Sequence, residues 1–159
     1  MNICFVFKDY PVVDNSSITG VGNYLHSVAQ KLSRNHSVII LTQTRDATVI
    51  KQKKVTIYSL KRLALPPIIQ KKSIFLLLYN IRVAWNLLHL HAKYHFDVIE
   101  FANWEVEGLI LALISLLFRL RIKIICRLHT GTYDVEYYYN TISLSIRAIH
   151  FMERSLINL

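Results

Sequence analysis

The chain opens with Met1-Asn2-Ile3-Cys4-Phe5-Val6-Phe7 and then reaches Ile18-Thr19-Gly20-Val21-Gly22-Asn23-Tyr24-Leu25. The first stretch is a short apolar run typical of a buried strand. The second opens a helix, because apolar residues recur behind it at helical spacing (Leu25, Val28, Ala29 and Leu32). Gly20 and Gly22 then lie at a helix N-terminus, where free N–H groups and the helix dipole attract anions. The pattern predicts a site for a phosphate-bearing ligand, although a tight turn also accounts for two glycines.

Strand and helix signals alternate along the rest of the chain. Further strands are expected over residues 37–42, 54–60, 97–101 and 123–128, and the alternating pattern of 54–60 indicates an edge strand. Further helices are expected over residues 71–93, 106–118 and 142–156. This β-α-β order with continuous apolar strands predicts an α/β fold, a Rossmann-like parallel sheet with helices on both faces.

The expected sheet indicates which loops carry function, and the pattern of residues 71–93 indicates which face of that helix is apolar. In parallel sheets, ligands gather at the carboxyl ends of the strands, which selects the loops at 8–22, 101–107 and 129–139. The helix over 71–93 carries an apolar face formed by Ile74, Leu77, Leu78, Ile81, Trp85 and Leu88.

The composition is that of one domain with an uneven charge. The chain has 159 residues, 53% of them hydrophobic, and a net charge of +9. Eight Lys or Arg and one acid lie from Arg45 to Lys72. Tyr58 is the one aromatic residue there that could stack a base, so we expect no nucleic-acid partner. Peripheral contact of residues 45–78 with an anionic membrane and a plain solvated basic face both fit this charge.

Several features indicate a cytoplasmic protein without a cofactor or metal. No apolar run reaches the length of a membrane span, and the first residues lack a signal sequence. Cys4 and Cys126 each lie in an apolar strand candidate, as small core residues do. His89, His91 and His95 are close in sequence but lack ligand partners beyond Asp97, so a polar helix end explains them better than a metal site.

Three loops together resemble glycosyltransferase family 4. Thr19 to Leu25, followed by Ala29-Gln30-Lys31-Leu32 and Asn35-His36-Ser37-Val38, resembles the family's glycine-rich first turn and the turn into its second strand. Asp97 to Glu100 with Asn103-Trp104-Glu105 looks like the fourth strand and its loop, and Arg127-Leu128-His129-Thr130 like the end of the fifth. One departure is Val21, which stands between two glycines that are often adjacent in the family.

The resemblance implies the N-terminal half of a GT-B architecture, with residues 1–159 as the acceptor-side domain, incomplete at its C-terminal end and without the donor-binding domain. The implied reaction transfers a sugar from a nucleotide-sugar donor to a hydroxyl of a glycan or glycolipid, with retention. The fragment alone is expected to be inactive, and the protein to act in the cytoplasm, at the inner face of the membrane if 45–78 binds lipid. The implied site residues are His129 as the catalytic residue, Gly20 and Gly22 for the donor phosphate, and Asn103, Trp104, Glu105, Thr130 and Tyr133 toward the acceptor.

Alternative interpretations remain open at this level. A nicotinamide-binding Rossmann domain requires glycines directly after the first strand and an acid after the second, and this chain has neither. A non-catalytic remnant or binding module is compatible with the same residues, and His129 can be a structural histidine.

Overall fold

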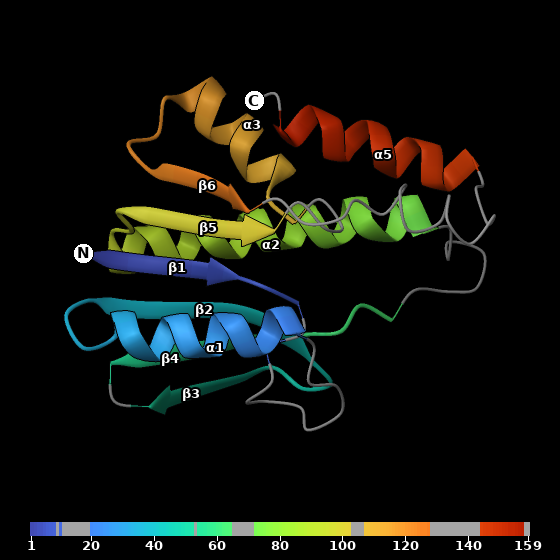
Figure 1. Cartoon of the computed structure of the whole chain (residues 1–159). Helices are drawn as coiled ribbons and strands as arrows, with labels where there is room; N and C mark the ends of the chain where they lie inside the picture. Colours follow the sequence, from blue (N-terminus) through green and yellow to red (C-terminus); the bar gives the residue numbers. More distant parts are fainter. Residues whose placement is uncertain are drawn as a thin grey trace.

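The computed structural model describes residues 1–8, 10, 20–52, 54–64, 72–102, 107–127 and 144–157. Its elements follow in the order β1 (Asn2–Val6), α1 (Gly20–Leu32), β2 (Ser37–Thr44), β3 (Thr48–Gln52), β4 (Val55–Lys61), α2 (Lys72–Tyr94), β5 (Val98–Ala102), α3 (Leu109–Phe118), β6 (Lys123–Arg127) and α5 (Leu144–Ile157). They form a three-layer α/β domain around a twisted sheet (Figure 1). The predicted fold class is therefore confirmed.

The sheet has six strands in the order β3-β4-β2-β1-β5-β6. All neighbours pair in parallel except β3, which runs antiparallel to β4. The strands at the centre are almost continuously apolar, since each is covered on both faces. Helices pack on both faces: α1 covers β1, β2 and β4 on one side, and α2, α3 and α5 pack together on the other (Figure 1).

One expectation about the sheet is wrong, and one strand was not predicted. Strand β4 is an interior strand with a partner on each side, and the edge strand is β3. The alternation in β4 arises because residues such as Thr56 and Tyr58 are only partly covered, whereas Val55 and Ile57 are buried against α1. Strand β3 has no apolar pattern in its sequence, because most of its side chains are exposed.

Helix α2 turns a different face to the core than its most obvious apolar pattern suggests. Its buried residues include Leu76, Tyr79, Val83 and Leu87. The face predicted from the sequence points largely to solvent, with Ile74, Leu77, Leu78, Ile81 and Trp85 all exposed. Among the helices that the structure describes, none is long and apolar enough to cross a membrane.

Candidate functional site

The strand order places a topological switch point between β1 and β5. The chain leaves β1 toward β2 on one side of the sheet, and β5 lies on the other side. The helix that follows β1, α1, packs on one face of the sheet and the helix that follows β5, α3, packs on the other. In such sheets ligands bind at the carboxyl ends of the two strands. The first turn of α1 lies at this same edge, because α1 runs back against the strand direction (Figure 1).

Backbone and side-chain hydrogen bonds hold the beginning of the loop after β1. The carbonyl oxygen of Lys8 accepts hydrogen bonds from the Thr42 hydroxyl at 2.9 Å and from the Gln43 N–H at 3.2 Å. The N–H of Tyr10 in turn donates to Thr42 Oγ1 at 3.3 Å. The Tyr10 hydroxyl lies 2.9 Å from Nδ1 of His26 on α1. Residues that leave β1 are thus fixed both to β2 and to α1.

A buried carboxylate, Glu107, connects three elements on the other side of the switch point. It is 4% exposed and precedes α3. Its Oε1 accepts hydrogen bonds from the N–H of Lys8 at 3.0 Å and from the hydroxyl of Tyr79 on α2 at 3.2 Å. A buried carboxylate is stable only when such donors replace its hydration. Glu107 therefore joins the end of β1 and the first half of α2 to the segment that follows β5.

The glycines proposed to hold phosphate lie in the first turn of α1. Gly20 begins the helix and Gly22 is buried within it. Neither has a positive φ, so these positions do not need glycine for its backbone freedom. A Cβ on Gly20 would meet no atom within 4 Å. The first N–H groups of a helix lack partners within the helix, so the missing side chain at Gly20 leaves open space beside potential anion donors.

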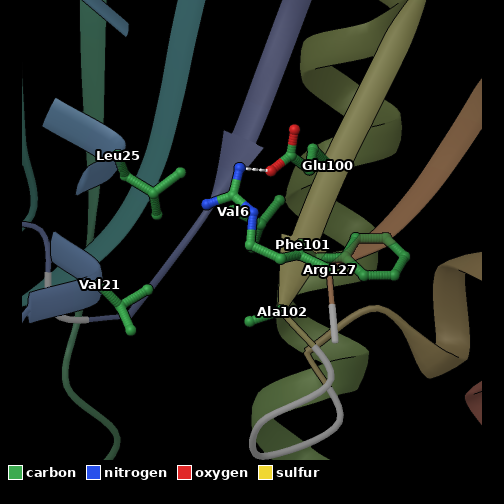
Figure 2. A pocket seen from close by; sticks show the side chains of 7 residues that line it. All are labelled: Val6, Val21, Leu25, Glu100, Phe101, Ala102 and Arg127. Atoms are coloured by element: carbon green, nitrogen blue, oxygen red, sulfur yellow. Dashed lines mark hydrogen bonds and ion pairs between the residues drawn. The ribbon is translucent and has the colours of Figure 1, made fainter. Parts of the chain in front are cut away.

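A shallow pocket at the same edge contains a charged pair that sequence reasoning missed. Its lining comes from β1, α1, β5 and β6: Val6, Val21, Leu25, Glu100, Phe101, Ala102 and Arg127 (Figure 2). The guanidinium of Arg127 forms an ion pair with Glu100 Oε1, and both side chains are largely buried. Arg127 also lies over the ring of Tyr24, 4.4 Å from its centroid. Arg127 thereby links β6 to β5 and to α1.

The signal for this pair is present in the sequence, but weak. Glu100 is the single charge inside β5, and Arg127 is the last residue of β6, after three apolar residues. An unneutralised charge at such a position is costly, so a partner on a neighbouring strand is expected. Only the register, with Glu100 beside Ile125 and Ala102 beside Arg127, identifies that partner.

The remaining site residues of the sequence analysis lie outside the described residues. These are His129, Thr130, Tyr133, Asn103, Trp104 and Glu105. Ala102 directly precedes the segment with Asn103, and Arg127 precedes the segment with His129. Ala102 and Arg127 are paired across β5 and β6. The segments that contain the predicted acceptor and catalytic residues therefore start side by side at this edge.

Two of the histidines and both thiols have structural environments. Nδ1 of His91 accepts a hydrogen bond from the Phe96 N–H at 3.1 Å. Burial and the neighbouring His95 lower the pKa of His91. Cys4 and Cys126 are free thiols whose pKa values are raised by burial. Within the described ranges, no three His, Cys, Asp or Glu side chains gather as metal ligands do.

Comparison with known proteins agrees with this architecture. The chain is similar in structure to sucrose-phosphate synthase from Thermosynechococcus elongatus, with a TM-score of 0.66 at 13% identity. The match covers 98% of this chain and 39% of that chain, so this chain spans well under half of its structural relative. No curated protein sequence matches the chain.

The switch point in a mostly parallel sheet, with the first turn of α1 at its carboxyl edge, defines a Rossmann-like α/β domain. The sequence profile described as Glycosyltransferase Family 4 matches residues 18–159. The chain belongs to glycosyltransferase family 4. This membership decides against a nicotinamide-binding Rossmann domain.

Proposed function

We propose that this chain is the acceptor-side half of an enzyme that transfers a sugar from a nucleotide-sugar donor to a hydroxyl group of a glycan or glycolipid. The family match over residues 18–159 carries the proposal. Its structural support is the carboxyl edge of the sheet, where α1, β1, β5 and β6 meet around the Glu100–Arg127 pair. A second domain across this edge would hold most of the donor in a GT-B enzyme.

Different residues at the carboxyl edge of the sheet have different proposed roles in the reaction. In the reaction, the bond from the anomeric carbon to the diphosphate breaks, a bond to the acceptor oxygen forms, and the acceptor hydroxyl loses its proton. Negative charge grows on the departing nucleoside diphosphate, and fixed N–H donors stabilise such charge. We propose that the first turn of α1, where Gly20 and Gly22 lie, supplies them. His129 is the proposed contact to the transferred sugar, with retention at the anomeric carbon.

The acceptor is proposed to bind between the two segments that leave β5 and β6 side by side. Their candidate contacts are Asn103, Trp104, Glu105, Thr130 and Tyr133. The Glu100–Arg127 pair joins β5 and β6, the strands that precede these segments, and Arg127 also contacts Tyr24 of α1. The pair is therefore proposed to position the acceptor segments relative to the α1 N-terminus, without touching the reacting atoms itself.

The experiment compares the 159-residue chain alone with a longer protein in which the donor-binding domain of a GT-B enzyme is joined to it. Release of nucleoside diphosphate from a panel of nucleotide sugars, and the mass of the glycosylated product, are measured. The 159-residue chain should show no turnover, whereas the longer protein should transfer sugar. No release from any donor by the folded longer protein would overturn the proposed function.

Gly20→Ala separates a phosphate site from a structural turn. The added methyl meets no protein atom, so it leaves the fold intact. If a donor phosphate occupies that space, Gly20→Ala should raise the donor KM several-fold. Lys31→Ala, at the opposite end of the same helix, is the matched control and should leave the donor KM unchanged. An unchanged donor KM in Gly20→Ala would remove the phosphate role.

A further inference from the structure

The first half of α2 exposes an apolar stripe that the sheet does not need. The stripe consists of Ile74, Leu77, Leu78, Ile81 and Trp85, which are 38% to 65% exposed. Their spacing places them on one side of the helix, opposite the buried residues Leu76, Tyr79, Val83 and Leu87. Apolar side chains gathered on one exposed helix face mark an interaction surface rather than chance exposure.

The charge around this stripe has a single sign. Between Asp46 and Asp97 the chain has nine Lys or Arg residues and no Asp or Glu. This segment therefore carries the whole net charge of +9, because the other ten cations are balanced by ten acids. Every charged side chain on α2 and β4 is therefore a cation.

Two of these cations are held next to α2. Lys61 and Arg62, at the end of β4, are exposed. The guanidinium of Arg82 on α2 donates a hydrogen bond to the carbonyl oxygen of Lys61. This bond ties the end of β4 to the middle of the stripe. Apolar side chains, an exposed tryptophan and the cationic end of β4 therefore lie close together.

We propose that the outer face of α2 lies on an anionic phospholipid surface, with its axis in the plane of the interface. Exposed Leu and Ile would enter the boundary between headgroups and acyl chains, and Trp85 would lie at headgroup level. Lys61, Arg62 and Arg82 would contact the lipid phosphates. The inference does not depend on the proposed enzymatic activity.

Electrostatics favours lipid over a second copy of this chain as the occupant. A symmetric dimer through α2 would bring two segments of like charge together, which costs free energy at moderate salt. An anionic bilayer gains from the same charge. The helix also has the wrong composition to cross the bilayer, in line with the finding for all described helices.

The position of the stripe on α2 determines which part of the domain lies near the lipid. α2 runs antiparallel to the strands, so its first half lies toward the carboxyl edge of the sheet (Figure 1). Docking through Ile74 to Trp85 therefore brings that edge close to the lipid surface. An acceptor carried on a lipid would then reach the site without leaving the bilayer.

Vesicle co-sedimentation tests the proposal with matched variants. Wild-type chain is mixed with vesicles of phosphatidylcholine alone or with added phosphatidylglycerol, at low and high salt. We expect binding to the anionic vesicles only, weakened by salt. Lys61→Gln with Arg62→Gln should weaken binding about fivefold for each cation, which corresponds to about 1 kcal/mol. Lys31→Gln with Arg34→Gln, at the end of α1 on the other face of the sheet, is the charge control and should have little effect.

The apolar contribution is tested in the same way. Leu77→Gln with Ile81→Gln should weaken binding at least about tenfold, because both side chains lose their apolar transfer into the interface. Leu116→Gln with Leu117→Gln is the matched control, since these α3 residues are 64% and 76% exposed but lie on another helix. The control variant should bind as the wild type does.

Tryptophan fluorescence tests the proposal without changing any residue of the stripe. Trp85 and Trp104 are the two tryptophans of the chain, so Trp104→Phe leaves Trp85 as the single reporter. Its emission should shift to shorter wavelength with anionic vesicles and be quenched by brominated lipid. Equal binding to neutral and anionic vesicles, no change in Trp85 emission, or loss of binding in the α3 control would each overturn the proposal. The proposal would also be overturned if the chain formed a dimer without lipid, and if Leu77→Gln with Ile81→Gln dissociated that dimer but still bound vesicles.

Discussion

Replacing Gly108 by alanine should destabilise the domain, because this position has no room for a side chain. A Cβ on Gly108 would lie 1.9 Å from both Cε2 and Cζ of Phe101. Carbon atoms prefer a separation of about 3.5–4 Å, so one of the two residues must move. Phe101 is 1% exposed and belongs to the main core, so its ring cannot swing into solvent.

The size of the effect follows from two opposing terms. Overpacking a close-packed core costs about 1–3 kcal/mol. Replacing glycine by alanine also restricts the unfolded chain, which returns about 0.4–1 kcal/mol. We therefore expect Gly108→Ala to lose about 1–2 kcal/mol of the free energy of unfolding. With a urea m-value of about 1–3 kcal/mol per molar, the unfolding midpoint should fall by about 1 M.

Gly20→Ala is the matched control for the same chemical change. The added methyl at Gly20 meets no atom within 4 Å, and the residue begins a helix. We expect an unchanged midpoint, or a gain of at most about 0.5 kcal/mol. Urea unfolding followed by circular dichroism compares both variants with the wild type. The reasoning is refuted if Gly108→Ala unfolds at the wild-type midpoint, or if Gly20→Ala loses as much stability as Gly108→Ala.

Three further predictions concern the site and the pH response. A double-mutant cycle with Arg127→Met and Glu100→Gln should give a coupling energy of about 1–2 kcal/mol in urea unfolding, since both charges are largely buried. In the complete enzyme, His129→Ala should lower kcat far more than it lowers Tm. The pKa of His91 is lowered by burial and by His95, so folding favours the neutral ring, and the free energy of unfolding should fall as the pH drops below its ordinary value of 6.5. Urea midpoints on both sides of that pH measure the fall, and His91→Asn should flatten it.

Each of these predictions has an outcome that contradicts it. Additive effects of the two substitutions in the cycle would show that Arg127 and Glu100 are not coupled. A His129→Ala enzyme that melts early, while its folded fraction keeps full kcat, would make His129 a core residue. A pH profile that His91→Asn leaves unchanged would assign the acid response to other groups.

The sequence was sufficient for the order and type of most elements. Buried parallel strands must be nearly continuous in apolar residues, and the helices between them need an apolar face, so both leave a pattern in the local sequence. The glycine-opened helix was located for the same reason, because Gly20 and Gly22 precede residues at helical spacing such as Leu25 and Ala29. These are local properties, set by neighbours along the chain.

Only the tertiary structure shows which residues pack or pair with partners that are distant in sequence. Helix α2 is apolar on two sides, so only packing against the sheet shows that Leu76 and Tyr79 are buried while Trp85 is exposed. β3 carries no apolar pattern, and only its pairing with β4 makes it a strand.

The same holds for the polar contacts of the site. Glu107 meets the N–H of Lys8 across 99 positions, and Arg127 meets Glu100 across 27. No local pattern encodes such contacts, because strand order and register bring these groups together. The physical reason is that burying a charge is tolerated only where the fold supplies its partner, and the fold chooses that partner from anywhere in the chain.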